Sequence, residues 1–554
     1  MNRVPSKIDA LAEQWYSKLI DLSPELATSV GSPIGADKLS DQSPAAEAHY
    51  NAERNKFMAQ LEAEPAIDEV DQITKHAMLN RLELENEIFE ARLAERNLNV
   101  IASPAQGIRD IFDLSPTATE TDWRNLVGRM NAVGAALAGY VETLREGIHN
   151  QNTPARRQVE EVAKQVNQIT ASNGFFIEFA NAATADGKEL PESLKRDLQK
   201  AAEAATQSYA LFGNFLTGEL FDAANVVDAV GREHYQLASR EFLGAKVDLD
   251  ETYEWGLEEL ARVTAEQEAV ANQIKRGATV EEAIEKLDND EKRKLNGAAE
   301  LQAWMQQLSD RAIEELGKSH FDIAPELRAL ECMIAPTNSG GIYYTGPTDD
   351  FSRPGRMWWS VPEGVTSFST WRETTTVYHE GVPGHHLQVA QAVYNKDELN
   401  SWRRNISWCS GHGEGWALYA ERLMQELGYL EDLGDQLGML DGQRMRAARV
   451  VLDIGVHLGK PRIDGTGTWD HAYAREFMGK NVHMAPAFID FEVNRYFGWP
   501  GQAPSYKIGQ RIWEQLRDQV SARQGAAFDI KAFHSKALNL GGLPLDTLKM
   551  AFDA

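Results

Sequence analysis

Cysteine is scarce in this chain, and long hydrophobic runs are absent. Cys332 and Cys409 are the only cysteines among 554 residues, too few for a disulfide framework, so we expect both to be buried free thiols. No segment approaches the roughly 20 consecutive apolar residues that a membrane-spanning helix needs. The first 15 residues also lack the continuous apolar region of a secretion signal. The sequence therefore predicts a cytoplasmic protein that does not bind membranes.

Lysine and arginine are also few relative to the acidic residues. Lysine and arginine number 56 against 83 acidic residues, which gives a formal net charge of −27. Nucleic acids and anionic membranes are bound through clustered lysine and arginine side chains, and no basic run offers such a cluster. We therefore exclude nucleic acid as a partner, while the oligomeric state is left open.

The regular feature of the chain is helical periodicity. Between Leu194 and Leu216 the apolar residues recur in steps of three or four, as on one face of a helix. Gly277 is placed to end a helix, and Thr279 with Glu282 forms a capping box that would begin the next one. Further amphipathic helices are expected at about 45–62, 70–97, 122–149, 155–171 and 251–276.

The pattern changes near residue 330. Short strand-like runs at 332–334, 342–344 and 357–361 are separated by turn residues, and helical periodicity resumes near 370. We predict a mainly α fold with two large helical lobes around a deep cleft and a small β-hairpin or sheet near 330–361. Residues 1–330 would be a scaffold lobe and 331–554 a catalytic lobe. No linker separates them, so we expect one integrated unit.

Three of the 13 histidines lie within eight residues, His379-Glu380-Gly381-Val382-Pro383-Gly384-His385-His386. The segment looks like an H-E-x-x-H metal site with two inserted residues. On a regular helix His385 would lie about 120° from His379, and His386 about 10 Å along the axis, too far for one ion. A widened, π-type turn at Pro383 and Gly384 would bring His385 over His379. Otherwise the segment is a helix break followed by surface histidines.

A third ligand is available from the later segment Gly411 to Glu421. Zinc sites with two histidines commonly add a carboxylate, and Glu414 is the candidate, although it could merely occupy a helix N-terminus. Glu421 would orient a histidine from behind, and His412 would be structural. Glu380 would point about 100° away from His379, beside the ion, in the position of a general base. One Zn²⁺ ion is expected, since two imidazoles and a carboxylate favour zinc by availability.

Several motifs resemble one bacterial family. The family shows H-E-x-x-P-G-H-H, E-G-W-A-x-Y-x-E and R-Y-x-x-W-P-G-Q-A-x-x-Y, which this chain carries at 379–386, 414–421 and 495–506. Residues 453–457 and 24–31 also fit. The chain is therefore similar to the family called domain of unknown function 885. The resemblance implies a mostly helical fold, similar to helical zinc carboxypeptidases and oligopeptidases, and a metallopeptidase-like activity.

The expected reaction is hydrolysis of amide bonds in short peptides by metal-activated water, with Glu380 as general base. A donor should stabilise the oxyanion, and the candidates are His457, Tyr496 and Tyr506, with Asp453 placed to orient His457. Each of these side chains is also typical of a buried structural residue.

A short peptide needs a cation for its terminal carboxylate. Arginine is suited to this contact, because its guanidinium binds carboxylates in a bidentate manner. We favour Arg495, because it adjoins Tyr496 within a motif. The full set of candidates is Arg353, Arg356, Arg446, Arg449 and Arg495. The turn-rich segment 336–356 would either bind peptide as an added strand or be a structural hairpin. Its candidate residues are Asn338, Gly340, Gly341, Tyr343 and Tyr344.

Two other functions remain open. The first is a metal-dependent hydrolase of non-peptide amides or esters, in which zinc and Glu380 would have the same roles. The second is a non-catalytic helical protein with a structural metal. Structural zinc sites are closed by four protein ligands, whereas His379, His385 and Glu414 leave one position open.

Overall fold

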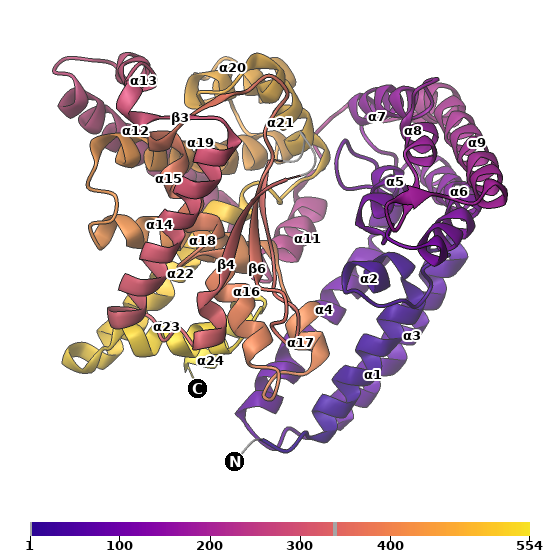
Figure 1. The fold of residues 1–554 in the computed structure, drawn as a ribbon, viewed down its shortest axis with the longest axis horizontal. Helices are drawn as coiled ribbons and strands as arrows, with labels where there is room; N and C mark the ends of the chain where they lie inside the picture. The colour runs from indigo at the N-terminus through magenta and orange to yellow at the C-terminus, as the bar shows by residue number, and fades with distance from the viewer. Residues whose placement is uncertain (1–2, 336–340, 554) are drawn as a thin grey trace.

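Helices make up most of the molecule, and this confirms the predicted mainly α fold (Figure 1). The computed structural model describes residues 3–335 and 341–553. The chain begins with four helices whose first turns are capped by serine or aspartate side chains, as the capping preference of these residues requires. They are α1 (Lys7–Leu22), α2 (Pro24–Ser29), α3 (Pro44–Ala63) and α4 (Glu69–Glu90).

The next helices have a hydrophobic core of their own and gather at one end of the molecule (Figure 1). That core takes its buried residues from Leu98 to Ala224. The elements of this segment are η1 (Leu93–Arg96), α5 (Pro104–Leu114), α6 (Glu120–His149), α7 (Arg156–Ile169), α8 (Phe175–Asn181), β1 (Thr184–Ala185), β2 (Lys188–Glu189), α9 (Glu192–Phe215), the π-helical turn η2 (Leu216–Leu220) and α10 (Phe221–Ala223).

The second and larger core joins the first helices to the rest of the chain. It contains Ile8 to Leu82 together with residues from Tyr235 to Phe552. The two cores therefore divide the chain near residues 98 and 224. The change in sequence pattern near residue 330 does not coincide with a boundary between them. The following elements are α11 (Arg232–Leu243), α12 (Leu249–Ile274), α13 (Val280–Asp288), η3 (Glu291–Arg293), β3 (Lys294–Asn296), α14 (Ala298–Ser319) and η4 (Pro325–Arg328).

A three-stranded sheet lies where short strands were predicted. It consists of β4 (Leu330–Ile334), β5 (Ile342–Thr345) and β6 (Gly355–Trp359) in the order β4-β6-β5. β6 runs parallel to β4 and antiparallel to β5. Among the described strands β5 pairs on one side only, so its other edge keeps backbone groups available for a further strand. A separate short strand, β7 (Ser367–Ser369), pairs with β3.

The remaining helices carry the motif residues. They are α15 (Thr370–Glu380), α16 (His385–Tyr394), α17 (Ser401–Asn405), α18 (Ser410–Glu426), α19 (Leu433–His457), α20 (His471–Asn481), α21 (Pro486–Gly498), α22 (Ser505–Gln524), η5 (Gly525–Ala527), α23 (Ile530–Asn539) and α24 (Leu545–Asp553). No helix in the described parts of the chain is long and apolar enough to cross a membrane.

Local signals predicted the helix ends well. The capping box of Thr279 and Glu282 is present at the start of α13, and Gly277 has the positive φ of 77° that a helix-ending glycine can adopt. The five expected amphipathic helices correspond to α3, α4, α6, α7 and α12, which confirms their existence. The helix expected at 70–97 ends earlier, because α4 stops at Glu90 and the separate turn η1 follows.

Candidate metal centre

The histidine motif lies on two helices with a break between them. α15 ends at Glu380, α16 begins at His385, and the intervening Val382–Pro383 peptide bond is cis. The predicted single helix with a widened turn is therefore wrong. Gly384 closes the break, because its N–H donates to the Tyr378 oxygen at 3.1 Å. A side chain would not fit there, since a Cβ atom on Gly384 would lie 1.9 Å from the His379 oxygen.

The break brings both histidines to one carboxylate. Glu414 Oε2 lies 3.3 Å from His379 Nε2 and 3.6 Å from His385 Nε2. One donor atom from each of the three residues lies within 4.8 Å of the others. Tetrahedral ligands at about 2.0–2.1 Å from zinc are separated by about 3.3 Å. The spacing of these donors therefore fits a single ion of that size.

Glu421 fixes the orientation of the first histidine. His379 Nδ1 donates to Glu421 Oε1 at 2.8 Å, and Thr375 donates to the second Glu421 oxygen at 2.9 Å. With its proton on Nδ1, the ring presents the Nε2 lone pair toward Glu414. A carboxylate behind a ligating histidine is a common feature of zinc sites. The placement of Glu421 agrees with the role that its sequence position indicated.

The electrostatics of the cluster call for a cation. Glu414 Oε2 is buried and accepts no hydrogen bond from the described residues, and it faces two imidazole nitrogens. Burial opposes charge on His379, but Glu414 and Glu421 outweigh it and raise the pKa of the imidazole to about 10. Burial also opposes the Glu414 charge, yet the two histidines hold the pKa of that carboxyl below its usual range. A proton or a metal ion can satisfy this arrangement, and the donor set of two nitrogens and one oxygen fits zinc.

Glu380 faces a cavity beside the cluster. The side chain is 7% exposed, and burial raises the pKa of its carboxyl above the usual value. The cavity has a volume of about 380 Å³ and is lined by residues of α15, α18, α19 and β5. Among its lining residues are His379, Glu380, Glu421, Asp441, Arg446 and His483. A substrate in this cavity would contact both Glu380 and His379, the candidate metal ligand among the lining residues.

Two neighbouring histidines serve the fold. His386 hydrogen-bonds the Tyr344 hydroxyl at 2.9 Å and donates to the Leu327 oxygen at 2.8 Å. His412 accepts from Gln388 at 3.1 Å and packs against Trp513. Burial lowers the pKa of His386 to about 4 and that of His412 to about 3, so both rings are neutral near pH 7. The structure keeps both outside the cluster, as their positions in the motifs suggested.

Close backbone packing positions Glu414 in α18. A Cβ atom on Gly415 would lie 2.5 Å from the carbonyl carbon of Gly509 in α22, and one on Gly509 would lie 2.1 Å from the Gly411 oxygen. Trp416, one position further, donates to the Pro383 oxygen at 2.9 Å. α18 therefore supplies a candidate ligand, contacts the broken segment and, through Glu421, orients His379.

The three candidate oxyanion donors lie in different surroundings. The Glu414 charge contributes to the raised pKa of Tyr506, after burial, and the ring lies 5.3 Å from the Arg449 guanidinium. Tyr506 is therefore near the cluster. Tyr496 instead donates to Glu492 and accepts from Arg449 at 2.6 Å.

His457 and Asp453 of α19 are buried, and both hydrogen-bond the motif segment 495–506. His457 Nε2 donates to the Tyr496 oxygen at 2.9 Å. Asp453 Oδ2 accepts from the Tyr235 hydroxyl at 2.7 Å and from the Gly501 N–H at 2.8 Å. Its Oδ1 lies 4.0 Å from His457 Nε2, too far for a hydrogen bond, so Asp453 does not orient His457 through one. These contacts engage His457 and Tyr496 with other residues, which leaves Tyr506 as the candidate donor among the three.

The arginine favoured from the sequence is engaged elsewhere. Arg495 donates to Glu492 at 3.0 Å and to Gln502 at 2.6 Å, and it is not among the described residues that line the cavity. Arg446 does line it. Its one hydrogen bond among the described residues is to the Gly442 oxygen at 3.3 Å, and its Nε is buried without a partner. The sequence around Arg446 and Arg495 does not indicate which of the two lines the cavity.

β5, the strand expected to bind peptide, lines the cavity through Ile342 and not through Tyr343 or Tyr344. Tyr343 is 38% exposed and stacks on Trp358, and Tyr344 bonds His386. The predicted contributors Asn338 and Gly340 lie outside the described residues.

Fold and site together define a mainly α-helical protein with a candidate cation centre of two histidines and one glutamate. Residues 24–551 match the family described as bacterial protein of unknown function (DUF885), and the chain belongs to that family. This match confirms the family that the motifs indicated.

Solved structures from two bacteria share the fold. One is a "putative lipoprotein" from Colwellia psychrerythraea, with a TM-score of 0.84 and 22% identity over 99% of this chain and 98% of that one. The other is a "putative lipoprotein of unknown function" from Shewanella oneidensis, with a TM-score of 0.76 and 17% identity over 99% of this chain and 100% of that one. No curated protein matches this chain. At these identities the likeness concerns the fold alone.

Proposed function

We propose that the protein is a zinc-dependent metallopeptidase that hydrolyses amide bonds of short peptides. The observation that carries this proposal is the convergence of His379, His385 and Glu414 within 4.8 Å, beside a cavity that Glu380 also lines. These three residues would hold one ion and leave a coordination position open, as catalytic zinc sites do. A bound zinc ion would supply Lewis acidity and lower the pKa of water.

The chain's own residues would move the proton and place the substrate. Glu380 would accept a proton from the attacking water and deliver it to the leaving amine, for which a carboxyl of raised pKa is suited. Tyr506 would donate a hydrogen bond to the developing oxyanion, a contact typically worth about 3–4 kcal/mol. The unpaired edge of β5 would bind the peptide backbone.

Arg446 would bind the terminal carboxylate of a short peptide. It is the arginine of α19 that lines the cavity with Glu380, and guanidinium groups bind carboxylates in a bidentate manner. We expect Arg446→Gln to raise KM about ten-fold or more for a peptide with a free C-terminus, since one charge-assisted contact is worth about 1.5–3 kcal/mol. The KM for the same peptide with an amidated C-terminus should change little. An equal change for both peptides would argue against this role.

The decisive experiment compares wild-type protein with Glu380→Gln and His385→Ala. We expect one zinc per wild-type chain by metal analysis and turnover of a short-peptide library. Glu380→Gln should keep the metal and lose activity by about 10²–10⁴-fold, the usual contribution of a general base. His385→Ala should lose both. Unchanged hydrolysis by Glu380→Gln with zinc still bound would refute the mechanism.

The same assay separates the other two functions. Turnover of acylated amino acids or esters without turnover of any peptide would point to a hydrolase of non-peptide substrates. Stoichiometric zinc without hydrolysis of either class would point to a structural metal. The raised pKa of Glu380 and its place in the cavity favour a catalytic centre.

We propose a cytoplasmic location from the sequence, although two proteins of similar fold are called lipoproteins. The name lipoprotein describes those two proteins. If this chain also carried a lipid, the lipid would hold it at a membrane surface without any spanning helix. Fractionation of cells that produce the protein, with detection by antibody, distinguishes the two locations. Recovery in the membrane fraction would contradict the cytoplasmic proposal.

A further inference from the structure

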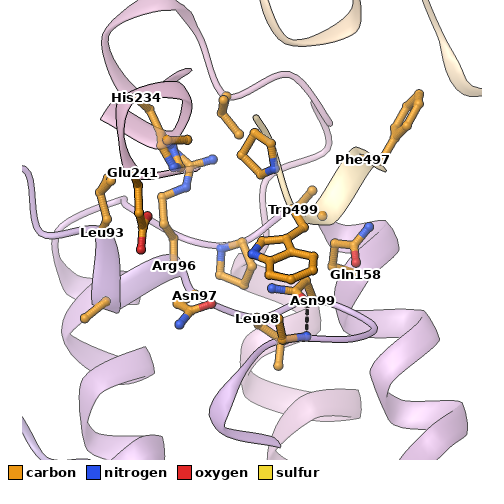
Figure 2. Close-up of a pocket in the computed structure, with 18 of the residues that line it drawn as sticks. Leu93, Arg96, Asn97, Leu98, Asn99, Gln158, His234, Glu241, Phe497 and Trp499 are labelled. Carbon is orange, nitrogen blue, oxygen red and sulfur yellow. Dashed lines mark hydrogen bonds between the residues drawn. The ribbon is translucent and has the colours of Figure 1, made fainter. Parts of the chain in front are cut away.

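A second cavity lies where the helices of the first half of the chain meet the segment after α21 (Figure 2). Its volume is about 300 Å³, at the lower end of the roughly 300–1,000 Å³ typical of small-molecule sites. Residues of η1, α11 and the turn 497–500 line it. Within the described chain it shares no lining residue with the cavity beside Glu380.

Arg96 lines this cavity, and its guanidinium has no partner among the described residues. No hydrogen bond, ion pair or ring contact joins its side chain to another of the described residues, and burial lowers the pKa of its guanidinium. Arg96 is partly buried, and a partly desolvated cation without a protein acceptor costs free energy, because the hydrogen bonds that it loses to water are not replaced. An anion that entered the cavity would replace them.

His234 lies next to Arg96 in Figure 2. Its Nδ1 is buried and has no hydrogen-bond partner among the described residues. Burial, with a contribution from the Arg96 charge, lowers the pKa of His234 to about 3. The ring is therefore neutral near pH 7 and offers one N–H donor. Arg96 and His234 together present donors to a single small acceptor group.

The opposite wall of the cavity is apolar and aromatic. Trp499 lies across from Arg96 in Figure 2, and its indole packs edge-on against Phe242 with 5.4 Å between ring centroids. Leu98 lies on the same side as Trp499 in Figure 2. An indole surface favours flat apolar groups. The cavity therefore has donors at one end and an aromatic surface at the other.

We propose that this cavity binds a small organic carboxylate with a flat apolar group, with the carboxylate on Arg96 and His234 and the apolar group against Trp499. Three carboxylates, Glu47, Asp228 and Glu241, also line the cavity. Asp228 is paired with Arg157, and burial raises the pKa of Glu47 and of Glu241. Arg96 can therefore offset one ligand charge. A dianionic phosphate fits less well, because its second charge would have no cation to offset the repulsion by these carboxylates. The binding activity is separate from peptide hydrolysis and does not rest on it.

The test uses two probes of nearly equal shape, indole-3-acetate and uncharged indole-3-acetamide, with titration calorimetry on the full-length protein. We expect the acetate to bind at least ten-fold more tightly than the amide. Arg96→Met should weaken acetate binding at least ten-fold and leave amide binding unchanged. Arg92→Met is the matched control, since Arg92 lies outside the lining, and should bind as wild type does.

Two further measurements complete the design. His385→Ala should keep its affinity for indole-3-acetate, whereas loss of binding would assign the ligand to the metal centre. Thermal unfolding of Arg96→Met should occur at or above the wild-type temperature, because the side chain has no partner to lose and its unpaired charge is removed. If that variant fails to fold, the acetate–amide comparison on wild type still decides. Absence of acetate binding, equal affinity for both probes, or tighter binding of inorganic phosphate would overturn the proposal.

Discussion

Glu421 is the residue whose effect on the candidate metal centre is easiest to isolate. It contacts His379 and Thr375 at 2.8 and 2.9 Å and is 2% exposed. We expect Glu421→Gln to lower zinc affinity about 10–100-fold, the usual effect of losing a carboxylate behind a ligating histidine. Competition with a chelator of known affinity measures it. Glu426→Gln, on the exposed side of the same helix, is the control and should bind zinc like wild type.

Glu492 makes stability depend on acid. Burial alone would raise the pKa of Glu492, but Arg449 and Arg495 outweigh it and lower the pKa to about 2. A carboxyl with a lowered pKa in the folded state stabilises the fold above its unfolded value of 4.5, and this contribution is lost as the pH falls through about 2.

The expected size of that effect follows from the shift. Linkage gives about 3 kcal/mol at pH 7 and roughly half of that at pH 3. Urea unfolding should show a larger difference between wild type and Glu492→Gln at pH 7 than at pH 3. Glu476→Gln removes an exposed ion pair with Lys480 and should show little difference at either pH. A Glu492→Gln difference that did not shrink in acid would contradict the assignment.

At the scale of helices, the break between α15 and α16 decides whether the centre forms. A Cβ atom on Gly384 would lie 1.9 Å from the His379 oxygen and 2.5 Å from the Tyr378 oxygen. Both are backbone atoms, which cannot move aside as a flexible side chain can. We expect Gly384→Ala to displace His385, to lower zinc affinity more than ten-fold, since each 1.4 kcal/mol is a factor of ten, and to lower the melting temperature.

The control for this substitution is another helical glycine. Gly479 in α20 has open space where a Cβ atom would be. Gly479→Ala should stabilise the protein by about 0.5–1 kcal/mol, the helix preference of alanine over glycine, with zinc binding unchanged. Metal stoichiometry and thermal unfolding of both variants provide the comparison. Full zinc occupancy in Gly384→Ala would show that the break tolerates a side chain.

The same break shows how far sequence reasoning reaches. Spacing alone indicated that His379 and His385 must converge and that Pro383 and Gly384 must allow it. It could not tell a widened turn from two separate helices, because the choice depends on Trp416, which holds the Pro383 oxygen from another helix. Arg446 was likewise one candidate among several, because its place in the cavity depends on how α19 packs against α15.

At the scale of the whole molecule, the two hydrophobic cores should respond separately to mutation. Leu198 is 1% exposed within the core formed by residues 98–224. We expect Leu198→Ala to cost about 2–5 kcal/mol and to raise hydrogen exchange mainly within 98–224. Zinc affinity should not change, because that segment supplies no donor to the cluster.

Leu211 offers a matched control on the same helix. It is 65% exposed, so Leu211→Ala should change stability by less than about 0.5 kcal/mol. Exchange that rises equally across the whole chain in Leu198→Ala would show that the two cores unfold as one unit. The sequence did not reveal this division, because residues 1–92 and 93–224 share one helical periodicity, and burial depends on which helices meet.

The crossing of α18 and α22 bears on how distant relatives can be interpreted. Gly415 and Gly509 leave no room for a side chain between the two backbones, whether or not any chemistry takes place nearby. If the protein has the proposed hydrolytic function, selection on shape and selection on catalysis act on interleaved positions of one segment. We expect a homologue that retains these glycines but has replaced Glu414 to be a pseudoenzyme, with the same architecture and no hydrolytic activity.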